Sequence, residues 1–321
     1  MKLWWCLASA LWLAGCGYTG EPLPPALNLP TRVTDVAVVE RGDQLIIQFS
    51  LPRTSTEGLV LAHPPQARVF VGAYTAGAAF DPVAWARQAR VLTGSESRYV
   101  TPAAEFYGKD VAVSVKLLNP RGRDAGFSNF AHVQVIPALA TPREITARAT
   151  AKGVELSWQG AAPAYRVLRQ GPDEKQYSLL EPAAASPFLD DKTAFGKTYR
   201  YLVQAVAKVS IGSAESELSA PVEITPEDTF PPSVPAGLSA VTGTKSVELV
   251  WARNTEPDLA LYRVYRAAGS GDWQKIGETR ATPNYSDRTV AAGSTYRYAV
   301  SAVDQSGNES GRSSEVTVVL P

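Results

Sequence analysis

The sequence is poor in the residues that most often build reactive sites. Its 321 residues include two cysteines, two histidines and one methionine, and no pair of Cys or His has the spacing of a zinc site. His63 and His132 are therefore expected to be structural or exposed to solvent. Lys and Arg together number 31, as do Asp and Glu, so the net charge gives no case for nucleic acid or an anionic membrane surface as a partner. We expect no metal and no cofactor.

The scarcity of cysteine also excludes one means of stabilisation. Cys6 lies in the apolar run 3–13, which has the length of a signal peptide and is too short to span a bilayer. Once that run is removed, Cys16 is the one thiol that remains, so no intrachain disulfide can form and each domain must rely on its hydrophobic core. No later apolar run approaches the length of a transmembrane helix.

The N-terminal segment has the parts of a lipid-attachment signal in order. Lys2 precedes the apolar run, and the run ends in Leu13-Ala14-Gly15-Cys16. This segment resembles a bacterial lipobox. The resemblance implies that residues 1–15 are a lipoprotein signal peptide and that Cys16 becomes an acylated N-terminus, because two or more acyl chains hold a protein on a membrane. The alternative is an ordinary secretory signal, and under either interpretation the chain leaves the cytoplasm.

The next segment, 16–30, is expected to be a tether. Its four prolines favour extended polyproline II structure, which would reach roughly 40 Å from the bilayer. In Gram-negative relatives of the lipobox family, a residue such as Gly17 after the lipidated Cys implies sorting to the outer membrane. Whether the protein faces the periplasm or the outside stays open. We therefore expect a lipid-anchored envelope protein with the membrane as one partner.

A repeat covers the C-terminal half of the chain. The pentapeptide VELSW at 154–158 returns as VELVW at 247–251, and TYRY at 198–201 returns at 295–298. A repeat of this length is a domain rather than a solenoid unit. Each copy contains short runs in which apolar and polar residues alternate, separated by Gly, Pro, Asn, Asp and Ser, and this pattern is typical of a β-sandwich.

Both copies resemble fibronectin type III domains, and the resemblance covers residues 141–321. It implies an all-β chain of tandem immunoglobulin-like sandwiches, with domains at 141–226 and 231–321. It also implies structural roles for four aromatic residues. Trp158 and Trp251 would lie in the cores, and Tyr199 and Tyr296 would be corner tyrosines whose hydroxyls bond to the upstream backbone.

Residues 31–137 are expected to form a divergent third sandwich of the same kind. Phe49 stands at the position of the core Trp, and Val111 at that of the corner Tyr. Asp81 and Pro82 form a typical helix start, so we predict a short helix over 81–90 with Trp85 on its buried face. The alternative is an unrelated β-rich domain.

The remaining polar motifs are weak candidates for chemistry. Asp190, Asp191 and Asp287 are interpreted as turn residues rather than paired catalytic carboxylates. Asp304-Gln305-Ser306-Gly307-Asn308-Glu309 could bind calcium, but it lacks the spacing of a calcium loop and fits a hairpin turn. Arg41-Gly42-Asp43 has the integrin-binding sequence, but Gly-Asp is a common turn pair. We predict no catalytic residues.

These observations favour a non-enzymatic protein that acts as a structural or protein-interaction scaffold. The alternative is a carbohydrate-binding accessory lipoprotein at the cell surface, as type III modules accompany secreted glycosidases. Trp85 and Trp273 could then be stacking platforms for sugar rings, although packing at the edge of a core is the simpler role. The expected partner besides the membrane is an unknown envelope protein or polysaccharide, and no nucleic acid.

Overall fold

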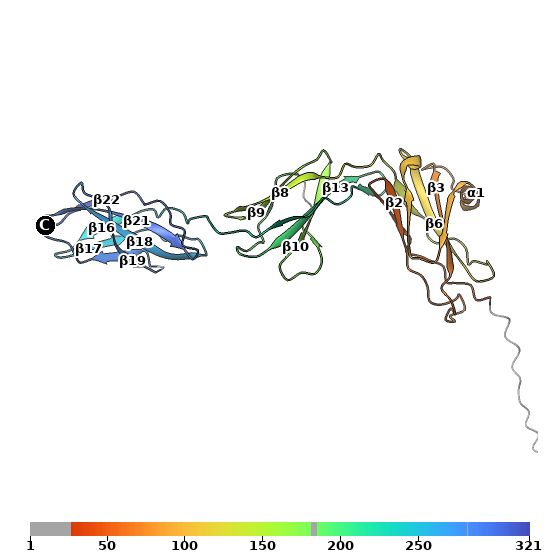
Figure 1. The fold of residues 1–321 in the computed structure, drawn as a ribbon, viewed down its shortest axis with the longest axis horizontal. Helices are drawn as coiled ribbons and strands as arrows, with labels where there is room; N and C mark the ends of the chain where they lie inside the picture. The colour runs from red at the N-terminus through yellow and green to blue at the C-terminus, as the bar shows by residue number, and fades with distance from the viewer. Residues whose placement is uncertain (1–26, 181–184, 281) are drawn as a thin grey trace, which may run out of the picture. The chain divides into compact units, whose positions relative to one another are not determined.

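The computed structural model describes residues 27–180, 185–280 and 282–321 (Figure 1). The predicted signal peptide, Cys16 and most of the predicted tether lie outside the described residues. The chain divides into unit 1, residues 1–139 with 206–216, and unit 2, residues 140–205 with 217–321. Among the described residues, no helix is long and apolar enough to cross a membrane. The division into three sandwiches, made from the sequence, stays a prediction.

Unit 1 contains two sheets that enclose one core. The first has the order β4-β3-β6-β7, and the second has the order β14-β1-β2-β5. All pairs are antiparallel except β1 with β14, where Glu40 lies opposite Ala214. The strands of unit 1 are β1 (Ala37–Arg41), β2 (Gln44–Gln48), β3 (Gln66–Tyr74), β4 (Arg90–Gly94), β5 (Arg98–Pro102), β6 (Asp110–Leu118), β7 (Ala131–Gln134) and β14 (Ser213–Glu215).

The core of unit 1 comes from the alternating apolar residues of these strands. Leu45 and Ile47 of β2 meet Val69 of β3 and Val113 of β6 in one buried cluster. Phe49 belongs to the same cluster and stacks on Tyr99, with ring centroids 5.9 Å apart. The side chains alternate because successive residues of a strand face opposite sides of the sheet.

The predicted helix is confirmed as α1 (Pro82–Gln88), which Asp81 caps by accepting hydrogen bonds from the N–H groups of Val83 and Ala84. It ends earlier than expected because Ala89 is extended and Arg90 begins β4. The other helical turn is η1 (Ala104–Phe106). Trp85 is buried and donates its Nε1–H to the Gly72 carbonyl at 3.1 Å. It therefore attaches α1 to the sheet as part of an aromatic cluster: Phe70, Tyr74, Phe80, Trp85, Phe127, Phe130 and His132.

Unit 2 contains two successive sets of paired sheets. In the first set, β12-β9-β8 forms one sheet, while β11, β10, β13 and β15 form the other. The residues of β13 fall in both units, with 199–205 in unit 2 and 206–208 in unit 1. The strands are β8 (Arg143–Thr150), β9 (Gly153–Gln159), β10 (Ala164–Gln170), β11 (Ser178–Leu179), β12 (Phe188–Asp190), β13 (Tyr199–Lys208) and β15 (Val222–Ile224).

The second set of unit 2 has the same plan. A three-stranded sheet, β16-β17-β20, faces a four-stranded sheet, β19-β18-β21-β22. A buried cluster that includes Leu249, Tyr262 and Tyr298 fills the space between them. The strands are β16 (Ser239–Thr242), β17 (Val247–Val250), β18 (Leu259–Ala268), β19 (Gln274–Thr279), β20 (Asn284–Asp287), β21 (Thr295–Asp304) and β22 (Val316–Val319).

Candidate functional site

The two tryptophans singled out in the repeat lie at equivalent places. Trp158 and Trp251 are both buried. Each contacts a tyrosine of the facing sheet edge-to-face at 5.2 Å between ring centroids, Trp158 with Tyr165 and Trp251 with Tyr262. Both indoles are enclosed by the protein, which leaves neither of them as a binding platform.

The two predicted corner tyrosines also have matching contacts. The hydroxyl of Tyr199 accepts a hydrogen bond from the N–H of Ala194 at 2.9 Å, and that of Tyr296 accepts one from Ala291 at 3.1 Å. In each case the donor lies five residues upstream, in the loop that leads into the strand. The bond holds this loop against the first residues of β13 or β21.

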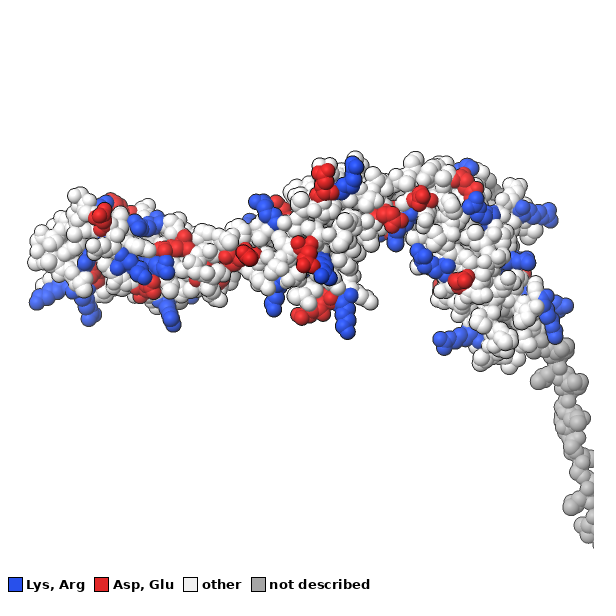
Figure 2. Space-filling model, in the orientation of Figure 1, with Lys and Arg blue, Asp and Glu red and all other residues white. Residues whose placement is uncertain are grey.

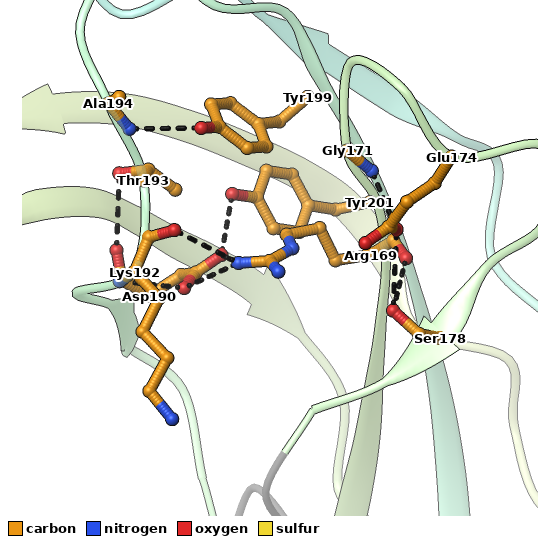
Figure 3. Close-up of polar contacts among 10 residues, drawn as sticks. All are labelled: Arg169, Gly171, Glu174, Ser178, Asp190, Lys192, Thr193, Ala194, Tyr199 and Tyr201. Carbon is orange, nitrogen blue, oxygen red and sulfur yellow. Dashed lines mark hydrogen bonds and ion pairs between the residues drawn. The ribbon is translucent and has the colours of Figure 1, made fainter.

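A buried polar cluster beside Tyr199 was missed by the sequence analysis (Figure 3). Asp190 ends β12 and is only 4% exposed. Its Oδ2 accepts hydrogen bonds from the Tyr201 hydroxyl at 2.9 Å and from Arg169 Nη1 at 3.1 Å, and its Oδ1 accepts the N–H of Lys192. The interpretation of Asp190 as a turn residue is therefore wrong, because it closes a strand and joins the two sheets.

The second half of unit 2 repeats the cluster. Asp287 ends β20 and is 2% exposed. Its Oδ2 accepts from the Tyr298 hydroxyl at 2.9 Å and from Arg266 Nη1 at 2.8 Å, and its Oδ1 accepts from the N–H and hydroxyl of Thr289. The turn interpretation of Asp287 is wrong for the same reason. We call Asp190–Arg169–Tyr201 and Asp287–Arg266–Tyr298 the two triads.

The protonation states follow from these contacts. Burial alone would raise the pKa of Asp287, but hydrogen bonds from Thr289, Tyr298 and Arg266 outweigh it and hold the pKa below its ordinary value. Burial raises the pKa of Tyr201 and Tyr298, and the neighbouring carboxylates raise it further. In each triad the aspartate side chain thus accepts hydrogen bonds from both a neutral phenol and a guanidinium group.

The triads are unsuited to catalysis. A carboxylate offers about four acceptor positions, and those of Asp287 are used by Thr289, Tyr298 and Arg266. No lone pair is left to take a proton from a substrate. The hydrogen bonds of the triads instead connect the two facing sheets.

Three carboxylates of unit 2 lie close together at the hairpin of the calcium-like motif, residues 304–309. Single oxygens of Asp228, Asp258 and Asp304 lie within 4.8 Å of one another. The carboxylate of Asp304 already accepts hydrogen bonds from the N–H and the side-chain amide of Asn308, and Asp228 accepts one from the Ser306 hydroxyl. These bonds fix the hairpin after β21 and connect it to residue 228.

The Arg-Gly-Asp sequence lies in the β1–β2 hairpin of unit 1. Arg41 forms an ion pair with Glu215 at 2.9 Å, and the N–H of Gly42 donates to the Glu215 carbonyl. The Asp43 carbonyl accepts a hydrogen bond from the N–H of Ala103. The hairpin is therefore held within unit 1, in keeping with its interpretation as a turn.

The histidines show no ligand geometry. His132 lies on β7, half-buried against Tyr74 at 4.8 Å between ring centroids, and burial lowers its pKa. His63 is exposed and lines a pocket of ≈ 230 Å³ in unit 1, whose lining also includes Arg121. This pocket has no carboxylate in its lining and so offers no acid–base pair.

Known proteins match this chain over part of its length. No family model matches it. Exoglucanase B of Cellulomonas fimi is 31% identical over 196 residues, which cover 56% of this chain and 17% of that enzyme. Amylopullulanase of Thermoanaerobacter thermohydrosulfuricus is 32% identical over 156 residues, which cover 47% of this chain and 10% of that enzyme. The solved structure of a Fn3-like protein from Clostridium thermocellum is 35% identical, covering 29% of this chain and 96% of that one with a TM-score of 0.25.

The chain carries fibronectin type III-like β-sandwiches. The chain spans at most 17% of the length of the two enzymes. The matched regions are thus short segments of much larger proteins. The fibronectin type III-like assignment describes the fold of this chain, and a fold by itself does not specify a function.

Removing one triad carboxylate should destabilise unit 2 strongly. Asp190→Ala leaves the charge of Arg169, whose side chain is 16% exposed, without its partner, and the expected cost is about 3–5 kcal/mol in free energy of unfolding. The matched control is Glu155→Ala, whose partner Arg148 is 73% exposed, with an expected cost of about 0–1 kcal/mol. Denaturant unfolding measures both. Equal costs would contradict a structural role for the triad.

Unit 1 contains a buried carboxylate that lacks such partners. Glu40 on β1 is 1% exposed, its Oε2 accepts the N–H of Ile136 at 3.1 Å, and its Oε1 has no partner among the described residues. Burial raises the pKa of Glu40 above its ordinary value of 4.5. The neutral form is therefore the one that the fold favours.

Glu40→Gln should make unit 1 more stable at neutral pH. A raised pKa contributes stability below the ordinary value of 4.5, and this contribution is lost as pH rises through the raised pKa. The advantage of the Gln variant should thus be small at about pH 4 and grow toward about pH 8. Hydrogen exchange of the β1 amides at several pH values measures this difference. An advantage that does not change with pH would contradict the prediction.

Proposed function

We propose that this protein is a non-catalytic, lipid-anchored envelope protein in which fibronectin type III-like sandwiches act as a structural or protein-interaction scaffold. The observation that carries the proposal is the saturation of the triads. Two buried carboxylates of unit 2, Asp190 and Asp287, use their acceptor positions to join the facing sheets. Function is left to the outer surfaces and to the anchor.

The proposed anchor is Cys16, after removal of residues 1–15. The lipobox resemblance and the absence of any other thiol beyond Cys6 support it. Acyl chains on Cys16 would hold the protein on the envelope. In a Gram-negative organism, Gly17 favours the outer membrane.

Cys16→Ser should release the protein from the membrane. Without the sulfur no diacylglyceryl group can be attached, so the variant should move to the soluble fraction after cell lysis and a wash at high salt, which screens charge-dependent contacts with lipid. Labelling with radioactive palmitate measures the acylation directly, and Cys6→Ser is the matched control. Equal labelling of the wild-type protein and Cys16→Ser would contradict the anchor.

Polysaccharide association is the second candidate function. The matched proteins are named Exoglucanase B and Amylopullulanase, which supports a carbohydrate-associated role for the shared sandwiches. Trp85 is the buried residue of α1 and cannot stack on a sugar. Trp273 and Tyr265, by contrast, lie outside the core cluster of the second half of unit 2. Arg312 lies 4.5 Å from the Tyr265 ring and 5.6 Å from the Trp273 ring, and Arg297 lies 5.1 Å from Trp273. Each guanidinium lies over a ring, so a sugar would have to use the opposite ring face or displace an arginine, whose N–H groups could then bond the sugar hydroxyls.

Trp273→Ala should weaken binding to a polysaccharide that the protein retains. Loss of one stacking face is expected to reduce affinity by roughly two- to tenfold. Affinity electrophoresis through gels with soluble cellulose or starch measures the retention. Tyr107→Ala, which removes an exposed aromatic ring of unit 1, is the control. Absence of retention on every polysaccharide would leave the scaffold as the function.

A further inference from the structure

One end of unit 1 exposes apolar side chains that its own fold leaves uncovered. Val60 is 82% exposed, the largest fraction for any large apolar side chain in the described part of the chain. Leu59 beside it is 50% exposed, and Leu27 is 47% exposed. With the neighbouring arginines at positions 53, 121 and 123, we call this group the apolar tip.

The apolar tip is held in place by backbone bonds. Thr54 and Val60 form a β-bridge, and the N–H of Leu61 donates to the Arg53 carbonyl at 2.9 Å. The turn between them is closed by the Ser55 N–H, which donates to the Leu59 carbonyl at 2.7 Å, and Gly58 supplies the positive φ of 79°. Leu59 and Val60 are therefore presented by a small, well-bonded hairpin.

The same hairpin binds the first described residues of the chain. Pro30 pairs with Ser55, the N–H of Thr56 donates to the Leu29 carbonyl, and the N–H of Thr31 donates to the Thr54 carbonyl. The Leu27 carbonyl accepts the side-chain amide of Asn119 at 3.0 Å. The chain thus leads into unit 1 at the apolar tip.

This location places the apolar tip near the proposed anchor. Positions 16 and 27 can be no farther apart than the extended chain allows, roughly 40 Å. An acylated Cys16 would therefore keep the tip close to the bilayer at a high effective concentration.

The charges of the apolar tip are complementary to an anionic lipid surface. Arg53, Arg121 and Arg123 are exposed, and none of them forms an ion pair with another described residue. Of the nearby carboxylates, Asp124 forms an ion pair with Lys116 at 3.4 Å, and Glu57 is exposed. The chain as a whole has equal numbers of acidic and basic residues, but the apolar tip has a local excess of positive charge. Figure 2 shows Lys and Arg side chains at this end of unit 1.

From these observations we infer that the apolar tip is a membrane-contact surface, in which Leu59 and Val60 enter the interface of the anchoring bilayer while the arginines contact anionic phospholipid headgroups. The inference rests on the proposed lipid anchor. Apolar side chains flanked by basic residues are the combination that binds such an interface, and an acyl anchor is strengthened by a second signal of this kind.

The chain from Gly17 onward, which lacks both Cys16 and the apolar run 3–13, tests the surface without the acyl group. This protein should float with vesicles of phosphatidylethanolamine and phosphatidylglycerol, bind vesicles of phosphatidylcholine less, and lose binding as salt is added. Adding Leu59→Ser and Val60→Ser should reduce the partition coefficient about tenfold or more. Arg121→Gln with Arg123→Gln should remove most of the salt dependence.

The matched control is Val241→Ser with Val319→Ser, two valines of unit 2 that are 66% and 63% exposed. It should bind like its parent. Failure of the parent to bind anionic vesicles, or an equal loss in the control, would overturn the inference. Palmitate labelling of the wild-type protein is a separate measurement, so an acylated protein whose tip ignores vesicles refutes the surface but leaves the anchor in place. A tip that binds vesicles in a protein that is not acylated supports the surface and refutes the anchor.

Discussion

The pairing of two buried carboxylates constrains how the sheets of unit 2 face each other. Asp190 and Asp287 end strands of the three-stranded sheets, whereas their arginine and tyrosine partners lie on the facing sheets. An apolar core tolerates small shifts between sheets at modest cost. A buried carboxylate that loses its partner costs several kcal/mol, so arrangements that separate Asp190 from Arg169 are strongly disfavoured. The triads thus add directional specificity to the hydrophobic core.

The same pairing occupies the carboxylates of the triads. Catalytic groups need a free lone pair or a mobile proton within reach of a substrate. Asp287 has its acceptor positions occupied, and Tyr298 keeps its proton because its pKa is raised. What the protein presents to partners is the outer face of each sheet and the loops at its ends.

The sequence patterns predicted what depends on local spacing. Alternation predicted strands such as β9, β17 and β21, and Asp81 with Pro82 marked the start of α1. The triads were missed because an Asp next to turn residues looks the same whether it ends a strand or belongs to a turn, and its Arg partner is about twenty residues away. The parallel pairing of β1 with β14 was missed for a similar reason. Contacts between distant segments depend on the whole topology, which no short motif encodes.

The described residues of unit 1 and unit 2 differ in how their buried carboxylates are paired. In unit 1 the sheets enclose one apolar core, the buried Glu215 pairs with Arg41, and the buried Glu40 is only half satisfied. Leu59 and Val60 do not belong to the core cluster of unit 1. Their hairpin is fully bonded, so polar residues at these two positions would preserve it equally well. Covering these two side chains would remove apolar surface from water, which is what the proposed contact with lipid would do.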